Sequence, residues 1–161
     1  MTNATNLVRI VVAGPGDAAE VCAMVRELAV HEGSLDAVTS DAQRWSEMLG
    51  DPKVTVLMAL AGDEPIGFVS AVHHLHLWSG TEIVGLDDLY VRPSARNGGV
   101  GEALMRALAE RAGELPIRWE VEEGNLAGQR FYLRLGARLR RKVVAWWNPA
   151  ATSGPRTRPT S

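Results

Sequence analysis

The stretch VRPSARNGGVGEALMRALAERAG, from Val91 to Gly113, combines a dense glycine cluster with the most regular helical pattern in the chain. Glycine adopts positive φ angles without strain and lets a backbone lie close to another group. Gly98, Gly99 and Gly101 precede apolar residues spaced three and four apart, which predicts an amphipathic helix over 100–111. The sequence therefore predicts a loop whose backbone closely approaches another group, followed by a helix that its buried face holds in place.

The segments on either side of this stretch predict a mixed order of strands and helices. Apolar, β-branched runs predict the earlier strands, and the alternation of Ile117, Trp119 and Val121 with charged residues predicts a strand with one buried face. Asn125 is placed to cap a helix that Gly136 ends. The resulting order predicts an α/β (α+β) fold, a mixed central β-sheet with helices on both faces. The predicted strands are Leu7–Val12, Val54–Leu60, Pro65–His74, Glu82–Val91, Ile117–Val121 and Arg138–Trp147, and two helices, the second over Asp41–Leu49, separate the first strand from the next.

Composition limits the class of protein. With 161 residues, 46% of them hydrophobic, the chain is sized for one domain, predicted over residues 1–148, followed by a disordered tail over 149–161. A net charge of −2 argues against nucleic acid as a partner, and no apolar run approaches a membrane span. The single Cys22 and the absence of a signal-like N-terminus indicate a cytoplasmic protein.

The glycine loop has the features of an anion site. Backbone amides of Gly98, Gly99, Val100 and Gly101 would lie at the positive end of the helix dipole, where phosphate oxygens bind, and Arg96 would add a charged donor. The loop is neither a Walker loop nor a dinucleotide fingerprint, because it lacks the GK[ST] of the first and the third glycine of the second. A plain strand-to-helix connection explains the loop equally well.

Two motifs in order resemble a known superfamily. Arg96, Gly99 and Gly101 fit RxxGxG, and the later stretch NLAGQRFYLRLGA contains Asn125 and Tyr132 at the expected places. Over residues 7–147 the chain is similar to the GNAT superfamily of acyl-CoA-dependent N-acetyltransferases. The resemblance implies a three-layer GNAT-like fold with two strands splayed at the acyl-CoA site, acetyl-CoA as co-substrate and no metal. It also implies the cofactor-binding residues Leu89, Tyr90, Val91, Arg96, Asn97, Gly98, Gly99, Val100, Gly101, Glu102 and Asn125.

Acyl transfer to an amine requires a neutral nucleophile and a stabilised leaving thiolate. Asp87 and Asp88, in LDDLYV, are the best-placed carboxylates, and we expect Asp87 to take the proton of the amine through a water or with a pKa that Asp88 raises. Neighbouring strand residues point to opposite faces, so only one aspartate is expected to face the acceptor. Tyr132 is the candidate for stabilising the thiolate. Packing beside Phe131 is the alternative role for Tyr132, and capping alone is the alternative for Asn125.

The acidic residues suggest the class of acceptor. RELAVHEGS and LDDLYV resemble the polyamine and thialysine branch of the superfamily, which implies that Glu32, Asp87 and Asp88 bind a small cationic amine. His31 stands where tyrosine is usual and Asp87 where glutamate is usual, so the preferred chain length stays open. The alternatives are acetylation of an aminoglycoside, an amino acid or a protein N-terminus, and a non-catalytic acyl-CoA-binding sensor.

Histidine and tryptophan residues give two further expectations. His74 and His76 share a strand face but lack a third ligand, so we expect them to lie at or beside the acceptor cleft rather than to hold a metal. Members of the superfamily are often dimeric. A homodimer is therefore the expected assembly, with Trp146 and Trp147 as candidates for the subunit contact.

Overall fold

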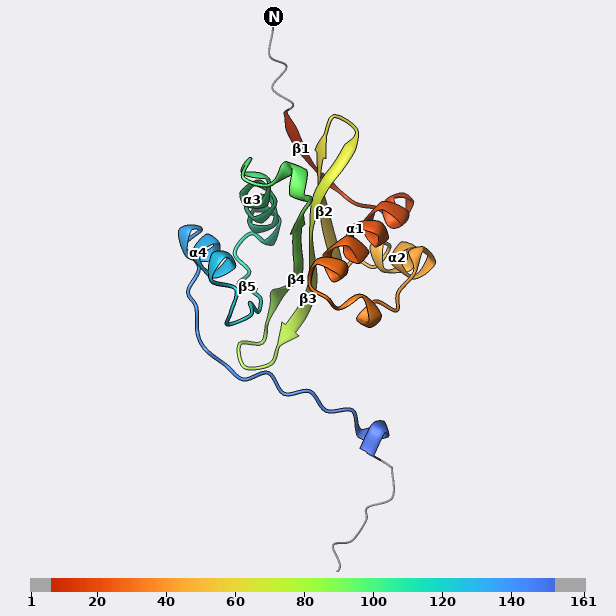
Figure 1. Ribbon diagram of the computed structural model, residues 1–161. Coiled ribbons are helices and arrows are strands. Elements are labelled where there is room, and N and C mark those ends of the chain that lie inside the picture. The colour runs from red at the N-terminus through yellow and green to blue at the C-terminus, as the bar shows by residue number, and fades with distance from the viewer. Residues whose placement is uncertain (1–6, 153–161) are drawn as a thin grey trace, which may run out of the picture. The chain divides into compact units, whose positions relative to one another are not determined.

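The computed structural model describes residues 7–152, in two compact units that meet in sequence between Glu122 and Glu123 (Figure 1). The first unit holds most of the regular structure, and the second holds one α-helix. The elements of the first unit are β1 (Val8–Val12), α1 (Ala18–His31), α2 (Ala42–Leu49), β2 (Val54–Ala61), β3 (Glu64–His76), β4 (Thr81–Val91), α3 (Val100–Ala112) and β5 (Ile117–Arg118). The second unit contains α4 (Leu126–Arg134), and short 3-10 turns lie at Pro15–Asp17, Leu35–Ala37, Pro93–Ala95 and Pro149–Thr152.

The five strands form one mixed sheet in the order β1-β2-β3-β4-β5. The first four strands pair antiparallel, and β5 pairs parallel to β4 because α3 carries the chain back across the sheet. Helices α1 and α2 cover one face of this sheet and α3 covers the other (Figure 1). The predicted α/β class with a mixed sheet between helices is therefore confirmed.

Each face of the sheet buries its own set of apolar side chains. Val21 and Met24 of α1 are fully buried and belong to the same cluster as Phe68 of β3. On the other face, Leu104 and Leu108 of α3 are 0% and 1% exposed. Their spacing of one helical turn places both on one stripe, as the sequence predicts. The buried stripe fixes α3 against the sheet, which holds the glycine loop at its N-terminus in position.

Two strand predictions need correction. The strand predicted over 117–121 ends at Arg118, although Trp119 and Val121 are still half-buried. The strand predicted over Arg138–Trp147 is wrong, since residues 138–148 form neither helix nor strand and Trp146 is 93% exposed. Alternating side chains make a strand only where another strand offers hydrogen bonds, and the described residues offer none to this segment.

The second unit confirms both predicted helix ends. Asn125 Oδ1 accepts a hydrogen bond of 2.9 Å from the backbone N–H of Gly128 and so caps α4. Gly136 has a φ of 94°, and its N–H donates to Leu133 O at 3.0 Å while that of Ala137 donates to Tyr132 O at 3.1 Å. This pair of bonds is a Schellman motif. The single domain predicted over 1–148 stays a prediction, and positions 153–161 of the predicted tail lie outside the described residues.

Candidate active site

β4 and β5 separate after two residue pairs. They pair only at Val84–Ile117 and Gly85–Arg118, and over Leu86–Val91 no strand among the described residues pairs with the β5-side edge of β4. A pocket of about 300 Å³ opens where the strands part, and we name it the β4–β5 cleft. This separation is the splay that the resemblance implies. The cleft is lined by His74, Gly85, Leu86, Asp87, Arg118, Trp119 and Glu120.

The pairing of β4 with β3 contains a β-bulge at Asp87. Asp88 lies opposite Ser70 and Leu86 lies opposite Ala71, which leaves Asp87 as an extra residue without a partner on β3. A bulge interrupts the alternation of side chains along a strand and redirects them. The alternation that we used above to separate Asp87 from Asp88 therefore fails at this point of the strand.

The acidic residues predicted to bind the acceptor interact with one another. Burial raises the pKa of Asp87, and the charge of His74 partly offsets this effect. Burial also raises the pKa of Asp88, as do the charges of Asp87 and, more weakly, Glu32, against a lowering by the hydrogen bond from Ser70. Glu32, Asp87 and Asp88, which we name the acidic group, therefore form one site of negative potential in which Asp87 lines the cleft.

The C-terminal end of α1 holds Glu32 in the acidic group. Gly33 follows it with a φ of 68°, a conformation that favours glycine. The N–H of Gly33 donates to Val30 O at 3.1 Å and that of Ser34 donates to Ala29 O at 2.8 Å, a second Schellman motif. The motif stops the helix directly after Glu32, so the backbone of this carboxylate has a fixed position.

An ion pair that the sequence did not reveal connects α1 to the end of β4. Arg92 binds Glu27 through two hydrogen bonds, and the hydroxyl of Tyr90 donates to the same carboxylate. The Tyr90 side chain is 5% exposed, so only its backbone remains available for the predicted cofactor contact. The pairing fixes the residues that lead directly into the glycine loop. Their separation of 63 and 65 positions along the chain explains why no local pattern identified them.

The glycine loop has the backbone geometry that an anion site needs. Asn97 and Gly99 have φ angles of 64° and 77°, and α3 begins without a side-chain cap. The first bond into the helix runs from Ala103 N to Gly99 O at 2.9 Å. The amides of the first helical turn have no intrahelical acceptor, and they are the groups that bind phosphate oxygens elsewhere. The backbone of residues 97–101 is therefore compatible with the predicted anion site.

The residues next to this loop differ in which of their groups remain available to bind a ligand. Arg96 is exposed, and its Nε donates to Val91 O at 3.0 Å. Glu102 accepts two hydrogen bonds from Arg106, at 2.8 and 2.6 Å, so its carboxylate has a local structural partner. Val100 is 5% exposed, which leaves only its backbone for binding. Leu89 and Val91 are half-buried on the part of β4 that lies beyond the pairs with β5.

Asn125 and Tyr132 lie in the second unit. Asn125 is the cap of α4 described above. The ring of Tyr132 meets that of Phe131 edge-on, with centroids 5.2 Å apart. Burial raises the pKa of the Tyr132 hydroxyl. A tyrosine in this state keeps its proton at neutral pH and can act as a hydrogen-bond donor.

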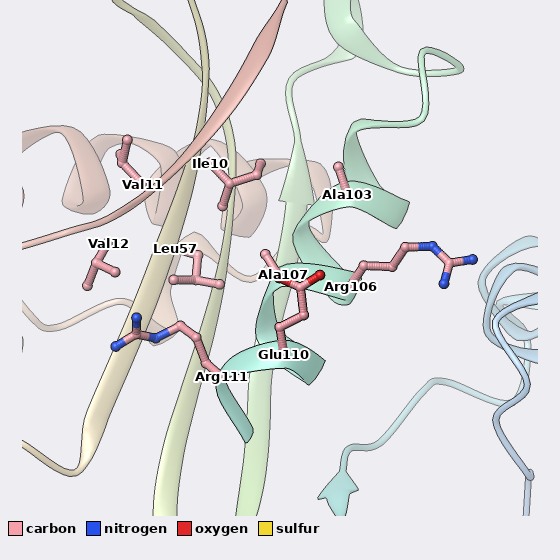
Figure 2. Close-up of a pocket in the computed structure, with 9 residues that line it drawn as sticks. All are labelled: Ile10, Val11, Val12, Leu57, Ala103, Arg106, Ala107, Glu110 and Arg111. Atoms are coloured by element: carbon pink, nitrogen blue, oxygen red, sulfur yellow. The ribbon is translucent and has the colours of Figure 1, made fainter. Parts of the chain in front are cut away.

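A second pocket lies on the α3 face of the sheet, near the edge formed by β1 (Figure 2). It has a volume of about 390 Å³, and side chains of Ile10, Leu57 and Ala107 contribute to its wall. None of the site residues predicted from the sequence lines it. Asp87, one of these predicted residues, lines the β4–β5 cleft instead, at the opposite edge of the sheet.

The cleft also contains residues to which the sequence analysis assigned no role in binding. Arg118 and Glu120 line it from β5 and from the residues that follow. Both lie on the polar side of the alternating segment that begins at Ile117, and this position is the signal that could have identified them. His74 lines the cleft, in agreement with the expectation for this histidine, whereas His76 does not.

Within residues 7–152, no group of three or more His, Cys, Asp or Glu side chains has a geometry that could hold a metal ion. No helix in that part of the chain combines the length and the apolar character needed to cross a membrane.

Comparison with known proteins agrees with this geometry. Residues 22–137 match the model of the acetyltransferase (GNAT) family. A thialysine N-ε-acetyltransferase of Caenorhabditis elegans is 29% identical over 119 residues, which cover 72% of this chain and 74% of the relative. The enzyme of the same name from Sus scrofa is 31% identical over 144 residues, covering 81% and 84%.

A solved structure shows the same fold at low identity. An aminoglycoside acetyltransferase from an uncultured soil metagenomic sample, in complex with sisomicin, superposes with a TM-score of 0.76. It is 15% identical in sequence, and the match covers 89% of this chain and 96% of the other.

Proposed function

We propose a substrate and a chemical route from the premise that this chain belongs to the GNAT family of acetyltransferases. The proposed reaction is the transfer of an acetyl group from acetyl-CoA to a primary amine of a small cationic acceptor, a polyamine or a lysine-like compound. The amine attacks directly while both substrates are bound. The observation that carries this choice of acceptor is the acidic group, Glu32, Asp87 and Asp88, of which Asp87 lines the β4–β5 cleft.

The cofactor would be held by backbone groups. Amides of residues 97–101 at the start of α3 fit the diphosphate, with Arg96 as a charged neighbour. The edge of β4 beyond Gly85 has no strand partner on the β5 side among the described residues, and Leu89–Val91 would meet the pantetheine arm and the oxyanion there. Acetyl-CoA supplies the activated acyl group.

The acidic group would bind the ammonium form of the acceptor. Three carboxylates attract a cation over a longer range than a single contact does. Deprotonating a lysine-like amine of pKa about 10.4 at pH 7 costs about 4.6 kcal/mol. We propose that the proton leaves at Asp87, directly or through a water, since this carboxylate lines the cleft.

Tyr132 is proposed to stabilise the leaving thiolate. Its raised pKa makes full proton transfer to a thiolate unfavourable, because a thiol ordinarily has a pKa near 8.5. In this proposal the Tyr132 hydroxyl instead donates a hydrogen bond that strengthens as negative charge develops on sulfur. In this proposal Asn125 adds a contact to the cofactor arm while it caps α4.

The test is release of CoA thiol from acetyl-CoA in the presence of separate amines. Thialysine, spermidine and lysine represent the proposed class, while an aminoglycoside, a D-amino acid and a peptide with a free N-terminus represent the alternatives. Preference for the first group supports the proposal. Turnover of the aminoglycoside alone would overturn the acceptor, and saturable binding of acetyl-CoA without thiol release would indicate a non-catalytic sensor.

Location and assembly complete the proposal. We propose that the chain acts in the cytoplasm as a homodimer, without nucleic acid or membrane as a partner. Light scattering after size exclusion would measure the mass of the assembly against the 17.4 kDa of one chain. A monomer at micromolar concentration would contradict the dimer.

A further inference from the structure

His74 of β3 is the histidine that lines the β4–β5 cleft. Its ring lies against the bare backbone of Gly85. A Cβ atom placed on Gly85 would be 3.0 Å from His74 Cε1 and 3.4 Å from Nδ1. The absence of a side chain at position 85 therefore creates the space that the imidazole occupies at the cleft wall.

His74 and Asp87 interact electrostatically across this space. The two residues line the same pocket from neighbouring strands, and the positive charge of His74 opposes the rise in the pKa of Asp87 that burial causes. The bulge at Asp87 directs this carboxylate away from the regular pairing with β3. A carboxylate beside an imidazole stabilises the imidazolium once the ring accepts a proton.

The two groups differ greatly in their ability to hold the proton of an amine. Transfer from an alkylammonium of pKa about 10.4 to an ordinary aspartate of pKa about 3.9 is unfavourable by about 6.5 orders of magnitude. Transfer to an ordinary imidazole of pKa about 6.5 is unfavourable by about 4 orders. For unperturbed groups the imidazole is thus favoured by a factor of about 400. An imidazole also changes its charge within the pH range in which enzymes work.

We propose that the proton removed from the acceptor ammonium comes to rest on His74, so that Asp87 and His74 together form the base of the reaction. This inference rests on the proposed acetyl transfer. The N–H bond of the ammonium breaks, its proton binds an imidazole nitrogen, and the freed lone pair attacks the thioester carbonyl. When the C–S bond breaks, the thiolate takes the second proton of the amine nitrogen, and His74 returns its own proton to water.

Several charged side chains lie in or beside the cleft that His74 lines. Asp87 lines the cleft from β4, Glu120 lines it from the segment after β5, and Asp88 belongs to the acidic group next to Asp87. Arg118 on β5 is the positive residue in the cleft lining and opposes them. Within the cleft lining, the acidic residues Asp87 and Glu120 therefore outnumber the single basic residue, Arg118.

The experiment compares His74→Gln with a matched control, His76→Gln, on the same strand but outside the cleft lining. With acetyl-CoA and the best amine from the panel above, His74→Gln is expected to lower kcat about 100-fold. Wild-type kcat should fall at acidic pH and level off near neutrality, whereas kcat of the variant should keep rising toward alkaline pH. Free imidazole in the buffer should restore part of the lost rate. His76→Gln should keep the wild-type profile.

Folding and cofactor binding are checked separately. Calorimetric titration with CoA should give the same affinity for wild type and His74→Gln, since the ring is assigned to the acceptor side of the reaction. Gly85→Ala is a second variant, because its new methyl group would displace the imidazole. It should lower kcat and still bind CoA.

The outcomes separate this inference from the proposed function. An active wild type together with a His74→Gln variant of unchanged kcat and unchanged pH profile would overturn the role of His74 and leave acetyl transfer intact. A wild type that binds CoA but releases no thiol with any amine would overturn the proposed function and the inference with it.

Discussion

Arg92, the residue directly after β4, forms an ion pair with Glu27 of α1 through two hydrogen bonds. Nη2 lies 2.7 Å from Oε1, and Nε lies 3.0 Å from Oε2. Arg92 Nη1 also donates to Pro65 O at 2.5 Å, so one guanidinium connects α1, β3 and β4. The geometry is the bidentate arrangement in which arginine and carboxylate groups bind most strongly.

Glu27→Gln is expected to destabilise the fold by about 1–2 kcal/mol at pH 7, because the ion pair is partly exposed and solvent screens it. The hydrogen bond from Arg92 lowers the pKa of Glu27. A carboxyl group with a lowered folded pKa adds stability above its unfolded pKa of about 4.3 and loses it as pH falls through the folded value. The difference between wild type and variant should therefore shrink below about pH 4 in urea unfolding.

Glu20→Gln is the matched control for this prediction. Its carboxylate lies 3.8 Å from Arg92 Nη2 without a hydrogen bond between them, so its loss should change stability by less than about 0.5 kcal/mol. Equal effects of the two substitutions at pH 7, or a Glu27→Gln effect that stays constant down to pH 3, would contradict the role of the two-point pair.

Gly67→Ala should destabilise the sheet by about 2–4 kcal/mol. A Cβ atom at this position would lie 2.6 Å from Tyr90 O and 3.2 Å from Val91 Cα, and backbone atoms inside a sheet cannot move aside easily. Gly14→Ala is the control, since its φ is −112° and no atom lies within 4 Å of the added methyl group. Thermal unfolding measures both. A Gly67→Ala variant as stable as Gly14→Ala would show that the strands can separate without loss.

Patterns within the chain predicted most of the fold. The glycine loop, the apolar stripe of α3 and the cap at Asn125 depend on nearby residues, and all three were predicted. The segment Arg138–Trp147 also alternates, but it needs a partner strand that a local pattern cannot supply, and the strand prediction failed there. Local spacing predicts which face a segment can bury, whereas pairing with a distant segment decides whether it becomes a strand.

The same distinction between local patterns and distant contacts applies to the candidate site. RxxGxG and the aspartates of LDDLYV identified the glycine loop and the acidic group. The bulge at Asp87 depends on the register between β3 and β4, which residue types do not reveal. Arg92 and Glu27 pair across 65 positions, and His74 meets Asp87 only because their strands lie side by side. Contacts of this kind require the folded sheet.

Gly99→Val should weaken CoA binding by about tenfold or more. Gly99 has a φ of 77°, which a β-branched residue adopts only with strain of about 1–3 kcal/mol, and the strain would move the first amides of α3. Gly62→Val carries a comparable strain, with a φ of 64°, in the turn between β2 and β3. Calorimetric titration with CoA should show loss of affinity for Gly99→Val alone. Unchanged affinity in both variants would show that the glycine loop is not part of the CoA-binding site.

Tyr132→Phe should lower kcat by about 10- to 100-fold and leave CoA affinity unchanged, because the substitution removes a hydrogen-bond donor and keeps the ring. The edge-on contact with Phe131, at 5.2 Å, needs only the ring, so the variant should keep this contact. The raised pKa of Tyr132 means that wild-type kcat should not fall through ionisation of this hydroxyl below pH 10. A parallel loss of CoA affinity would assign the hydroxyl a structural role.

Asp88→Asn should weaken acceptor binding and stabilise the fold at the same time. The KM for the amine is expected to rise about fivefold to tenfold, because one charge of the acidic group is lost. Burial, the charge of Asp87 and that of Glu32 raise the pKa of Asp88. A carboxyl group whose folded pKa lies above its unfolded pKa destabilises the protein as pH rises through both values. The variant should therefore unfold a few degrees above wild type at pH 7, and the gain should vanish near pH 3.

Asp63→Asn is the matched control for Asp88→Asn, because it removes the same charge from the exposed turn between β2 and β3. Its KM for the amine and its melting temperature should both stay close to wild type. If Asp88→Asn lowered the melting temperature at pH 7, the hydrogen bond with Ser70 would outweigh the repulsion within the acidic group. An unchanged KM in Asp88→Asn would mean that the acceptor cation binds at Asp87 and Glu32 without the help of Asp88.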